Sequence, residues 1–316
     1  MKQILKKCIP SWIWADIRKK RILSDQNRIS ALCDSYIDSY FKNIEGHYNL
    51  VPKKDLTGKK ILWQYWAQGF DEANLPDVVK NCLASVDANK GDYEIIRLSD
   101  NDIADYIDFP DFVYERKPNY TTTSFSNILR LALLYLYGGC WIDATVYLSG
   151  PIAKRYSDYD FFMFQRDDNE TEKKYWEGTY AYYFGWDSKF KVRVLTSIAF
   201  SKAGATFTRD YLNLLLLVWQ KNPTYPFYFT FQVLYNQLVA SKKSSPHCPI
   251  ESDCTPHMLM QIINDPDAPF TIVDCLKAGN IHKLSYKGIN EDRYADIMNN
   301  IPMTLDKIRE RDSLSD

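Results

Sequence analysis

Asp143 is the residue of this sequence whose type and position point most directly to chemistry. It lies within residues 140–146, a short, apolar and β-branched segment that predicts a strand buried on both faces. A buried carboxylate has to be paired, bound to a metal ion, or placed at the carboxyl end of its strand, where ligands bind in open α/β sheets. In a regular strand Thr145 shares the face of Asp143, so the pair could bind a sugar hydroxyl or help hold a divalent cation beside a diphosphate. The alternative is a buried carboxylate that only caps a nearby loop.

A second group of polar residues lies in the apolar segment that precedes this strand. Ser126 and Arg130 are four residues apart, and Asn127 and Arg130 are three apart, so on a helix their side chains can meet. A guanidinium in such an apolar helix needs an anionic partner. Asp143 or a phosphate group could supply that partner, and a purely structural ion pair is the alternative.

The elements that position these residues follow from the apolar pattern around them. Residues 123–137 predict one amphipathic helix, and Gly138 and Gly139 end it because both can adopt positive φ without strain. Strands at residues 61–66 and 93–98 alternate with helices before it, which predicts a largely parallel α/β sheet in the amino half. In the second half we expect strands at residues 161–164, 180–184, 197–200 and 281–285 and helices at residues 207–220, 229–239 and 256–263.

The composition is that of a globular chain with little net charge. The 316 residues are 46% hydrophobic and 25% charged, which argues against a disordered protein. A formal net charge of −1 argues against general nucleic-acid binding. Seven Cys and four His residues are scattered without metal-ligand spacing, so we expect no structural zinc site. Reduced thiols suit a cytoplasmic protein.

The amino end, residues 1–23, combines basic residues with Ile and Trp. No segment is long and apolar enough to cross a bilayer, and no signal peptide is recognisable. A basic, tryptophan-bearing segment could lie on an anionic membrane surface, at the inner face of the plasma membrane. Equally, it could be a helix packed on the main domain with a solvated basic face. We expect a helical extension over residues 1–55, a main domain over residues 56–290, and a helix with a charged tail over residues 291–316.

Three short motifs occur in order along the chain. Residues 126–130 are Ser-Asn-Ile-Leu-Arg, residues 137–139 are Tyr-Gly-Gly, and residues 141–146 are Trp-Ile-Asp-Ala-Thr-Val. This order resembles the core signature of capsular polysaccharide synthesis glycosyltransferases, which are similar to the family 32, DXD-containing sugar transferases. An opening Ile-Leu-Trp-Gln-Tyr-Trp at residues 61–66 and a closing Ile-His-Lys-Leu-Ser-Tyr at residues 281–286 strengthen the resemblance.

The resemblance covers residues 58–288 and implies a GT-A-like fold, with a Rossmann-like nucleotide-binding half and a mixed central sheet flanked by helices. It implies a bacterial hexosyltransferase that moves a sugar from a nucleotide-diphosphate donor to a glycan or lipid-linked saccharide of the capsule or cell surface, with retention of anomeric configuration. Asp143 and Arg130 would be catalytic. A divalent cation, Mn²⁺ or Mg²⁺, would be held by Asp143, Thr145 and His282. The donor would be bound by Trp63, Gln64, Trp66, Ser126, Asn127, Asp143, Thr145 and Lys283.

Two positions depart from the pattern of the enzymes that the chain resembles. Thr145 stands where the second Asp of the DXD motif would contact the metal, and a threonine hydroxyl is a neutral, weak metal ligand. Asn127 stands where those enzymes usually carry Asp. The sequence therefore leaves the need for a metal open. It also leaves a second hypothesis, a nucleotide-sugar- or glycan-binding protein with a transferase fold and no turnover.

Overall fold

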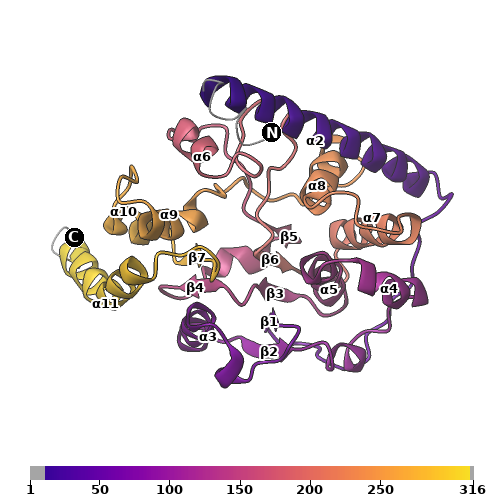
Figure 1. Ribbon diagram of the computed structural model, residues 1–316. Helices are drawn as coiled ribbons and strands as arrows, with labels where there is room; N and C mark the ends of the chain where they lie inside the picture. Colours follow the sequence, from indigo (N-terminus) through magenta and orange to yellow (C-terminus); the bar gives the residue numbers. More distant parts are fainter. Residues whose placement is uncertain (1–10, 314–316) are drawn as a thin grey trace.

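A five-stranded mixed sheet forms the centre of the protein (Figure 1). The computed structural model describes residues 11–313, and the strand order is β2-β1-β3-β6-β5. β1 runs parallel to β2 and β3, whereas β6 is antiparallel to both β3 and β5. β4 and β7 form a separate antiparallel ribbon. The strands are β1 Ile61–Tyr65, β2 Glu94–Leu98, β3 Gly139–Ile142, β4 Val146–Leu148, β5 Phe161–Phe162, β6 Ile198–Ser201 and β7 Ile281–Lys283.

Helices cover both faces of this sheet, which confirms the predicted α/β class with its GT-A-like mixed sheet. On one face α5 packs on β1, β3 and β6, then α7 packs on α5, and α8 and α2 form the outer layer (Figure 1). α3 lies against β4 on the other face. The α-helices are α2 Ser11–Phe41, α3 Asp77–Asn89, α4 Asp111–Arg116, α5 Thr122–Tyr137, α6 Lys173–Thr179, α7 Thr206–Lys221, α8 Thr230–Ala240, α9 Met258–Asn264, α10 Ile272–Ala278 and α11 Glu291–Ser313. Short 3-10 helices are η1 Glu72–Asn74, η2 Ile103–Asp105, η3 Lys117–Asn119, η4 Lys154–Asp158 and η5 Thr255–His257.

The ends of α5 are determined by local chemistry. The Thr121 side chain caps the first turn by accepting a hydrogen bond from the Ser124 backbone amide. At the other end Gly138 and Gly139 have φ values of 72° and 94°, which an L side chain rarely adopts. A Cβ atom on Gly139 would lie 2.3 Å from the Ile61 carbonyl oxygen, so this glycine also lets β3 lie close beside β1. The Tyr-Gly-Gly motif therefore joins the helix directly to the central strand.

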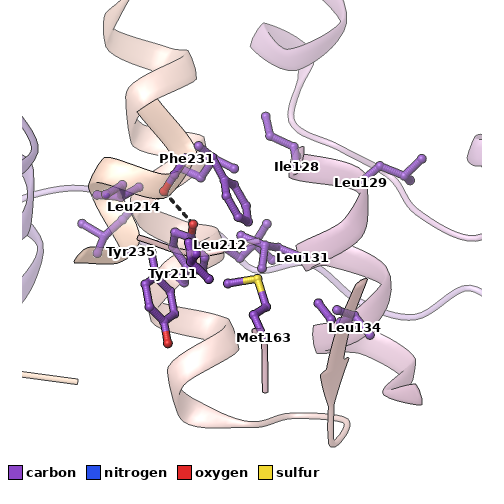
Figure 2. Close-up of a cluster of buried hydrophobic side chains, with 14 of the residues drawn as sticks. Ile128, Leu129, Leu131, Leu134, Met163, Tyr211, Leu212, Leu214, Phe231 and Tyr235 are labelled. Atoms are coloured by element: carbon purple, nitrogen blue, oxygen red, sulfur yellow. Dashed lines mark hydrogen bonds between the residues drawn. The ribbon is translucent and has the colours of Figure 1, made fainter. Parts of the chain in front are cut away.

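The apolar face of α5 is part of the main core (Figure 2). Ile128, Leu131 and Leu134 are fully buried against side chains of α7 and α8. Tyr211 of α7 donates a hydrogen bond of 2.7 Å to the Phe231 carbonyl, so its buried hydroxyl is satisfied. Each such large side chain contributes about 1.5–3 kcal/mol through burial. α5 is thereby held firmly, and the polar residues on it have defined positions.

Two predicted strands differ from the structure. The segment at residues 140–146 is not one strand, because β3 ends at Ile142 and a turn follows, in which the Val146 amide bonds to the Asp143 carbonyl. The remaining residues begin β4, which leaves the main sheet and pairs with β7. Residues 180–184 form turns rather than a strand, since the amides of Tyr183 and Phe184 both bond to the Tyr180 carbonyl.

The amino-terminal helix α2 packs across α7 and α8 from Ile22 onward. Ile22, Ile29 and Ile37 are buried against the domain, and the buried Gln26 side chain accepts a hydrogen bond from the Lys191 amide. From Ile22 onward α2 is therefore a helix packed on the main domain, and both alternatives for residues 1–23 stay open. Residues 1–10 lie outside the described part of the chain, so membrane contact through residues 1–23 stays a prediction. No helix within the described range is long and apolar enough to span a membrane.

Candidate functional site

The site is centred on Asp143, which directly follows the carboxyl end of β3. The parallel strands β1 and β3 end at the same edge of the sheet, where open α/β folds bind ligands. The Asp143 amide donates a hydrogen bond of 2.8 Å to the Ser197 carbonyl just before β6. The backbone of this residue is thus tied to the segment that leads into β6.

Three side chains bind the Asp143 carboxylate. Arg130 Nη2 and Trp141 Nε1 donate to its Oδ1 atom over 3.0 and 2.8 Å, and Lys283 Nζ lies 3.4 Å from its Oδ2 atom. The Asp143 side chain is 26% exposed to solvent, whereas the Arg130 side chain is 2% exposed. The carboxylate is therefore buried on the Arg130 side and open to solvent on the other.

The charged state of this cluster follows from its surroundings. Burial alone would raise the pKa of Asp143, but Lys283 and Arg130, with hydrogen bonds from Trp141 and Arg130, hold that pKa below its usual value. Burial lowers the pKa of Arg130, and the charge of Asp143 opposes this shift. A guanidinium stays protonated in proteins, so the pair is ionised at neutral pH.

Arg130 is held from both sides by α5 and by aromatic rings. Its Nη1 atom donates a hydrogen bond of 2.6 Å to Asn127 Oδ1, one helical turn earlier. Its guanidinium lies 4.8 Å from the ring centroid of Trp141 and 5.6 Å from that of Phe231, within the range of cation–π attraction. The predicted meeting of Asn127 and Arg130, and the pairing of Arg130 with Asp143, are both present. Asn127 itself orients Arg130 and does not line the cavity described next.

A cavity of about 590 Å³ opens over Asp143. Trp66 and Tyr286 form an aromatic wall, with their rings edge to face and their centroids 5.6 Å apart. Hydroxyl groups at the start of α5 also line the cavity, as does Tyr228, which is 58% exposed. The described residues that line the cavity are Tyr65, Trp66, Ala67, Gln68, Thr121, Thr122, Thr123, Ser126, Arg130, Trp141, Asp143, Thr145, Thr196, Ser197, Tyr228, Lys283, Tyr286 and Lys287. The predicted residues Trp66, Ser126, Arg130, Asp143, Thr145 and Lys283 are among them.

Two residues predicted to bind the donor lie in the core instead. Trp63 is fully buried, and its Nε1 atom donates to the Gly138 carbonyl over 2.9 Å. Gln64 is also fully buried, and its Oε1 atom accepts from Arg97 Nε over 3.0 Å. Every residue of β1 is buried, and within residues 61–66 only Tyr65, at the end of the strand, and Trp66, which follows it, line the cavity. The assignment of Trp63 and Gln64 to the donor site is therefore corrected.

His282 does not join the cavity either, although Lys283 does. Its Nε2 atom lies 2.8 Å from Ser149 Oγ and its Nδ1 atom 3.5 Å from Cys275 Sγ, on the opposite face of β7. Burial lowers the pKa of His282 to about 4, so its ring is neutral. Within residues 11–313 no three His, Cys, Asp or Glu side chains are grouped to hold a metal ion. The predicted ligand set of Asp143, Thr145 and His282 is therefore not assembled.

Sequence reasoning missed several residues of the cavity. Tyr286 is the last residue of the closing motif and Lys287 follows it, so their position near Lys283 could have indicated them. The Thr121–Thr123 run precedes the Ser126 motif by one helical turn, which is also a usable signal. Tyr228 comes from a loop 85 residues after Asp143 with no local pattern, so only the tertiary structure identifies it.

The family model for capsular polysaccharide synthesis proteins matches residues 13–301 of this chain. The chain belongs to this family. The match includes the central sheet, the β4–β7 ribbon and every residue that lines the cavity. Membership in the capsular polysaccharide synthesis family supports a glycosyltransferase as the general class of the protein. Such a class uses a nucleotide-sugar donor and a glycan acceptor.

Two further comparisons add little to this assignment. Among solved structures, a chain entitled PaToxG Glycosyltransferase is similar at 15% sequence identity with a TM-score of 0.33. The similarity covers 72% of this capsular polysaccharide synthesis protein and 83% of that chain. A search of curated protein sequences gives no match. The function therefore has to be argued from the family and the site.

Proposed function

We propose that this protein transfers a hexosyl group from a nucleoside-diphosphate sugar to a capsular or other cell-surface polysaccharide intermediate, with retention of configuration. The observation that carries the proposal is the Asp143 carboxylate, ionised and oriented by Arg130, Trp141 and Lys283 at the floor of the cavity. Its open side can accept hydrogen bonds from sugar hydroxyl groups, and ordered carboxylates of this kind give strong, directed bonds.

The cavity walls suggest how the donor lies. The rings of Trp66 and Tyr286 offer flat apolar surfaces on which a nucleobase can stack. Lys283 lines the same cavity beside Asp143, where it can contact the diphosphate. The amino end of α5, with the Thr121–Thr123 hydroxyls, adds donors and a positive helix dipole to the cavity. The transferred sugar then lies over Asp143.

The acid–base groups that line the cavity favour retention of the anomeric configuration over its inversion. Among the described residues that line it, Asp143 is the only carboxylate. It is paired with two cations and its pKa lies below the usual value, so it is a poor base for the acceptor hydroxyl. An inverting transfer would need such a base. We propose instead that the leaving phosphate oxygen accepts that proton.

The proposed transfer exchanges one bond of the anomeric carbon for another. The bond from the anomeric carbon to the phosphate oxygen breaks, and the acceptor oxygen forms its bond on the same face of the sugar. The acceptor proton passes to the departing phosphate oxygen. Positive charge from Lys283 stabilises the charge that develops on the diphosphate, which is the largest electrostatic requirement of the reaction. Asp143 positions the sugar and stays ionised throughout.

The test is Asp143→Asn, which keeps the shape of the side chain and an oxygen that can accept from Arg130. We expect sugar transfer and donor hydrolysis to fall about 100-fold or more, the effect of losing one directed electrostatic contact. Asp160→Asn is the control, because Asp160 is exposed, lies outside the cavity, and pairs with Lys202. Products are measured by mass spectrometry after a donor screen. Unchanged turnover in Asp143→Asn would contradict the site.

The alternative is a binding protein with no turnover, and Thr145 and Asn127 motivate it because both replace acids of the related enzymes. Calorimetry with uridine- and guanosine-diphosphate sugars, run beside the product assay, separates the two functions. Donor binding with neither hydrolysis nor transfer to capsular oligosaccharide acceptors would favour the binding protein.

A further inference from the structure

Lys283 occupies the place that a divalent cation would take beside Asp143. Its ammonium lies between Asp143 Oδ2, at 3.4 Å, and Thr145 Oγ1, to which it donates a short hydrogen bond. These two residues correspond to the first and last positions of the DXD-like segment. The Lys283 side chain is 24% exposed and lines the cavity, so the ammonium faces the space where a donor would lie.

The backbone keeps this lysine in place. In the β4–β7 ribbon Val146 pairs with Lys283, and the Leu284 amide donates a hydrogen bond of 2.9 Å to the Thr145 carbonyl. Because successive strand residues face opposite sides, the same register turns His282 into the protein and Lys283 toward Asp143. The position of the ammonium is thus a property of the ribbon and not of one flexible surface side chain.

The oxygen atoms around the site do not fit a divalent cation. Asp143 Oδ1 already accepts from Arg130 and Trp141, which leaves one carboxylate oxygen. Thr145 contributes a neutral hydroxyl, and His282 faces away. Mg²⁺ requires near-octahedral oxygen coordination and is usually bound through one or two carboxylates plus phosphates, whereas here the one available oxygen is shared with an ammonium. A cation in that place would also be repelled by Lys283 and Arg130.

The charges of Asp143, Arg130 and Lys283 would allow a diphosphate to bind without a divalent cation. Asp143 is balanced by Arg130, whose side chain is buried, so Lys283 leaves one positive charge facing the cavity. Lys287 also lines the cavity, with its ammonium 5.5 Å from the Tyr286 ring centroid. The start of α5 adds a partial positive charge. Together these groups can neutralise most of the charge of a nucleoside diphosphate.

We propose that the Lys283 ammonium replaces the divalent cation of DXD-type sites, so that this protein binds its donor and transfers the sugar without a metal ion. This inference rests on the proposed function. Lys283 contacts the diphosphate oxygens of the donor, and Asp143 and Thr145 orient its ammonium. The substitution of Thr for the second Asp then has a chemical reason: a second carboxylate at that position would bind the lysine and compete with the diphosphate for it.

The experiment measures nucleoside diphosphate binding by calorimetry after dialysis of the full-length protein against EDTA. UDP and GDP are the probes, each titrated in EDTA and then with excess Mn²⁺ or Mg²⁺. For the diphosphate that binds, we expect affinities with and without metal to agree within about threefold. Lys283→Met, which keeps the apolar stem, should weaken binding about 10–100-fold in EDTA, as expected for losing a charge-assisted hydrogen bond. The corresponding nucleoside, uridine or guanosine, should bind Lys283→Met and the unsubstituted protein alike.

Lys202→Met is the matched control. Lys202 is exposed, pairs with Asp160 at 3.0 Å, and lies at the end of β6 opposite to Ser197. Its substitution should leave diphosphate affinity unchanged. Circular dichroism and thermal unfolding check that Lys283→Met is folded, and equal nucleoside affinity shows that its cavity is intact. The product assay is repeated in EDTA with the same proteins.

Each outcome decides between the two proposals. Diphosphate binding or sugar transfer that requires Mn²⁺ or Mg²⁺ overturns the role of Lys283 and leaves the glycosyltransferase proposal standing. Equal diphosphate affinity of Lys283→Met and the unsubstituted protein in EDTA also overturns that role. Metal-independent binding that depends on Lys283, without transfer to any tested acceptor, supports the lysine site and contradicts the transferase. Absence of nucleotide binding in every condition overturns both.

Discussion

At the scale of single residues, the candidate site consists of a buried cation, Arg130, that orients the partly exposed carboxylate of Asp143. Arg130 is 2% exposed within the most apolar helix of the amino half, where an unpaired guanidinium would be very costly. Asn127, Asp143 and the ring of Trp141 stabilise the guanidinium, whose buried Nε atom has no hydrogen-bond partner among the described residues. In the proposed function Asp143 therefore serves stability on one side and ligand binding on the other, so its substitution should affect both.

Arg130→Met tests the structural half of this arrangement. The substitution removes the partner that holds Asp143 Oδ1, while Trp141 and Lys283 remain, so we expect the free energy of unfolding to fall by about 3 kcal/mol. Urea unfolding measures the change. Arg309→Met is the control, since both side chains of its ion pair with Asp306 are exposed and the substitution should change stability by less than about 1 kcal/mol. Equal stability of Arg130→Met and the unsubstituted protein would show that the ion pair adds nothing to the fold.

At the scale of elements, two connections bring the site together. The Gly138–Gly139 link joins α5 to β3 without a loop, which places Arg130 and Asp143 within hydrogen-bond distance. The β4–β7 ribbon then adds Lys283 from the far end of the chain. A sheet edge, a helix and a ribbon thus each supply one charged group. Displacing any of them separates the charges.

Gly139→Ala tests the first connection. At φ 94° a Cβ atom would meet the Ile61 carbonyl oxygen at 2.3 Å, so β1 and β3 would have to separate. We expect a loss of about 3 kcal/mol or more in unfolding free energy, from backbone strain plus the clash. Gly58→Ala is the matched control, because Gly58 has a φ of 76° but no atom within 4 Å of the added Cβ. Similar losses in both variants, measured by thermal unfolding, would assign the effect to φ alone.

At the scale of the whole molecule, packing keeps two histidines neutral. Burial lowers the pKa of His282 and of His257 to about 4, from an ordinary value of 6.5. In the unfolded chain both would be protonated below that ordinary value, whereas in the folded protein they stay neutral. The unfolded state therefore binds more protons between these values, and stability is lost as the pH falls from about 6.5 to 4.

The expected size of this effect can be checked with one variant. For His282, acidification from about pH 7 to about pH 5 should lower the free energy of unfolding by about 2 kcal/mol. Urea unfolding across this range is compared between the unsubstituted protein and His282→Gln, which lacks the titrating group. The variant should lose less stability on acidification by about this amount. Parallel pH profiles would contradict a buried, neutral His282.

Much of the fold was predictable because local chemistry determines it. The apolar face of α5, its threonine cap and its terminal glycines are local signals, and so are the short strands of the parallel half. The strand prediction failed at residues 180–184, where an aromatic-rich stretch packs into turns. Such side chains favour strands and buried turns alike, because both supply an apolar environment.

The sequence by itself determined the family motifs and the α/β class, since these depend on residues near one another in the chain. It offered Asp143 and a phosphate group as partners for Arg130, and the structure shows the pair with Asp143. Only the tertiary structure decided which side chains face the cavity. It buried Trp63 and His282, and it brought Lys283 to Thr145 across 138 positions. The physical reason is that strand register determines the face of the strand on which each side chain lies. The register of β4 with β7 depends in turn on the packing of the whole domain.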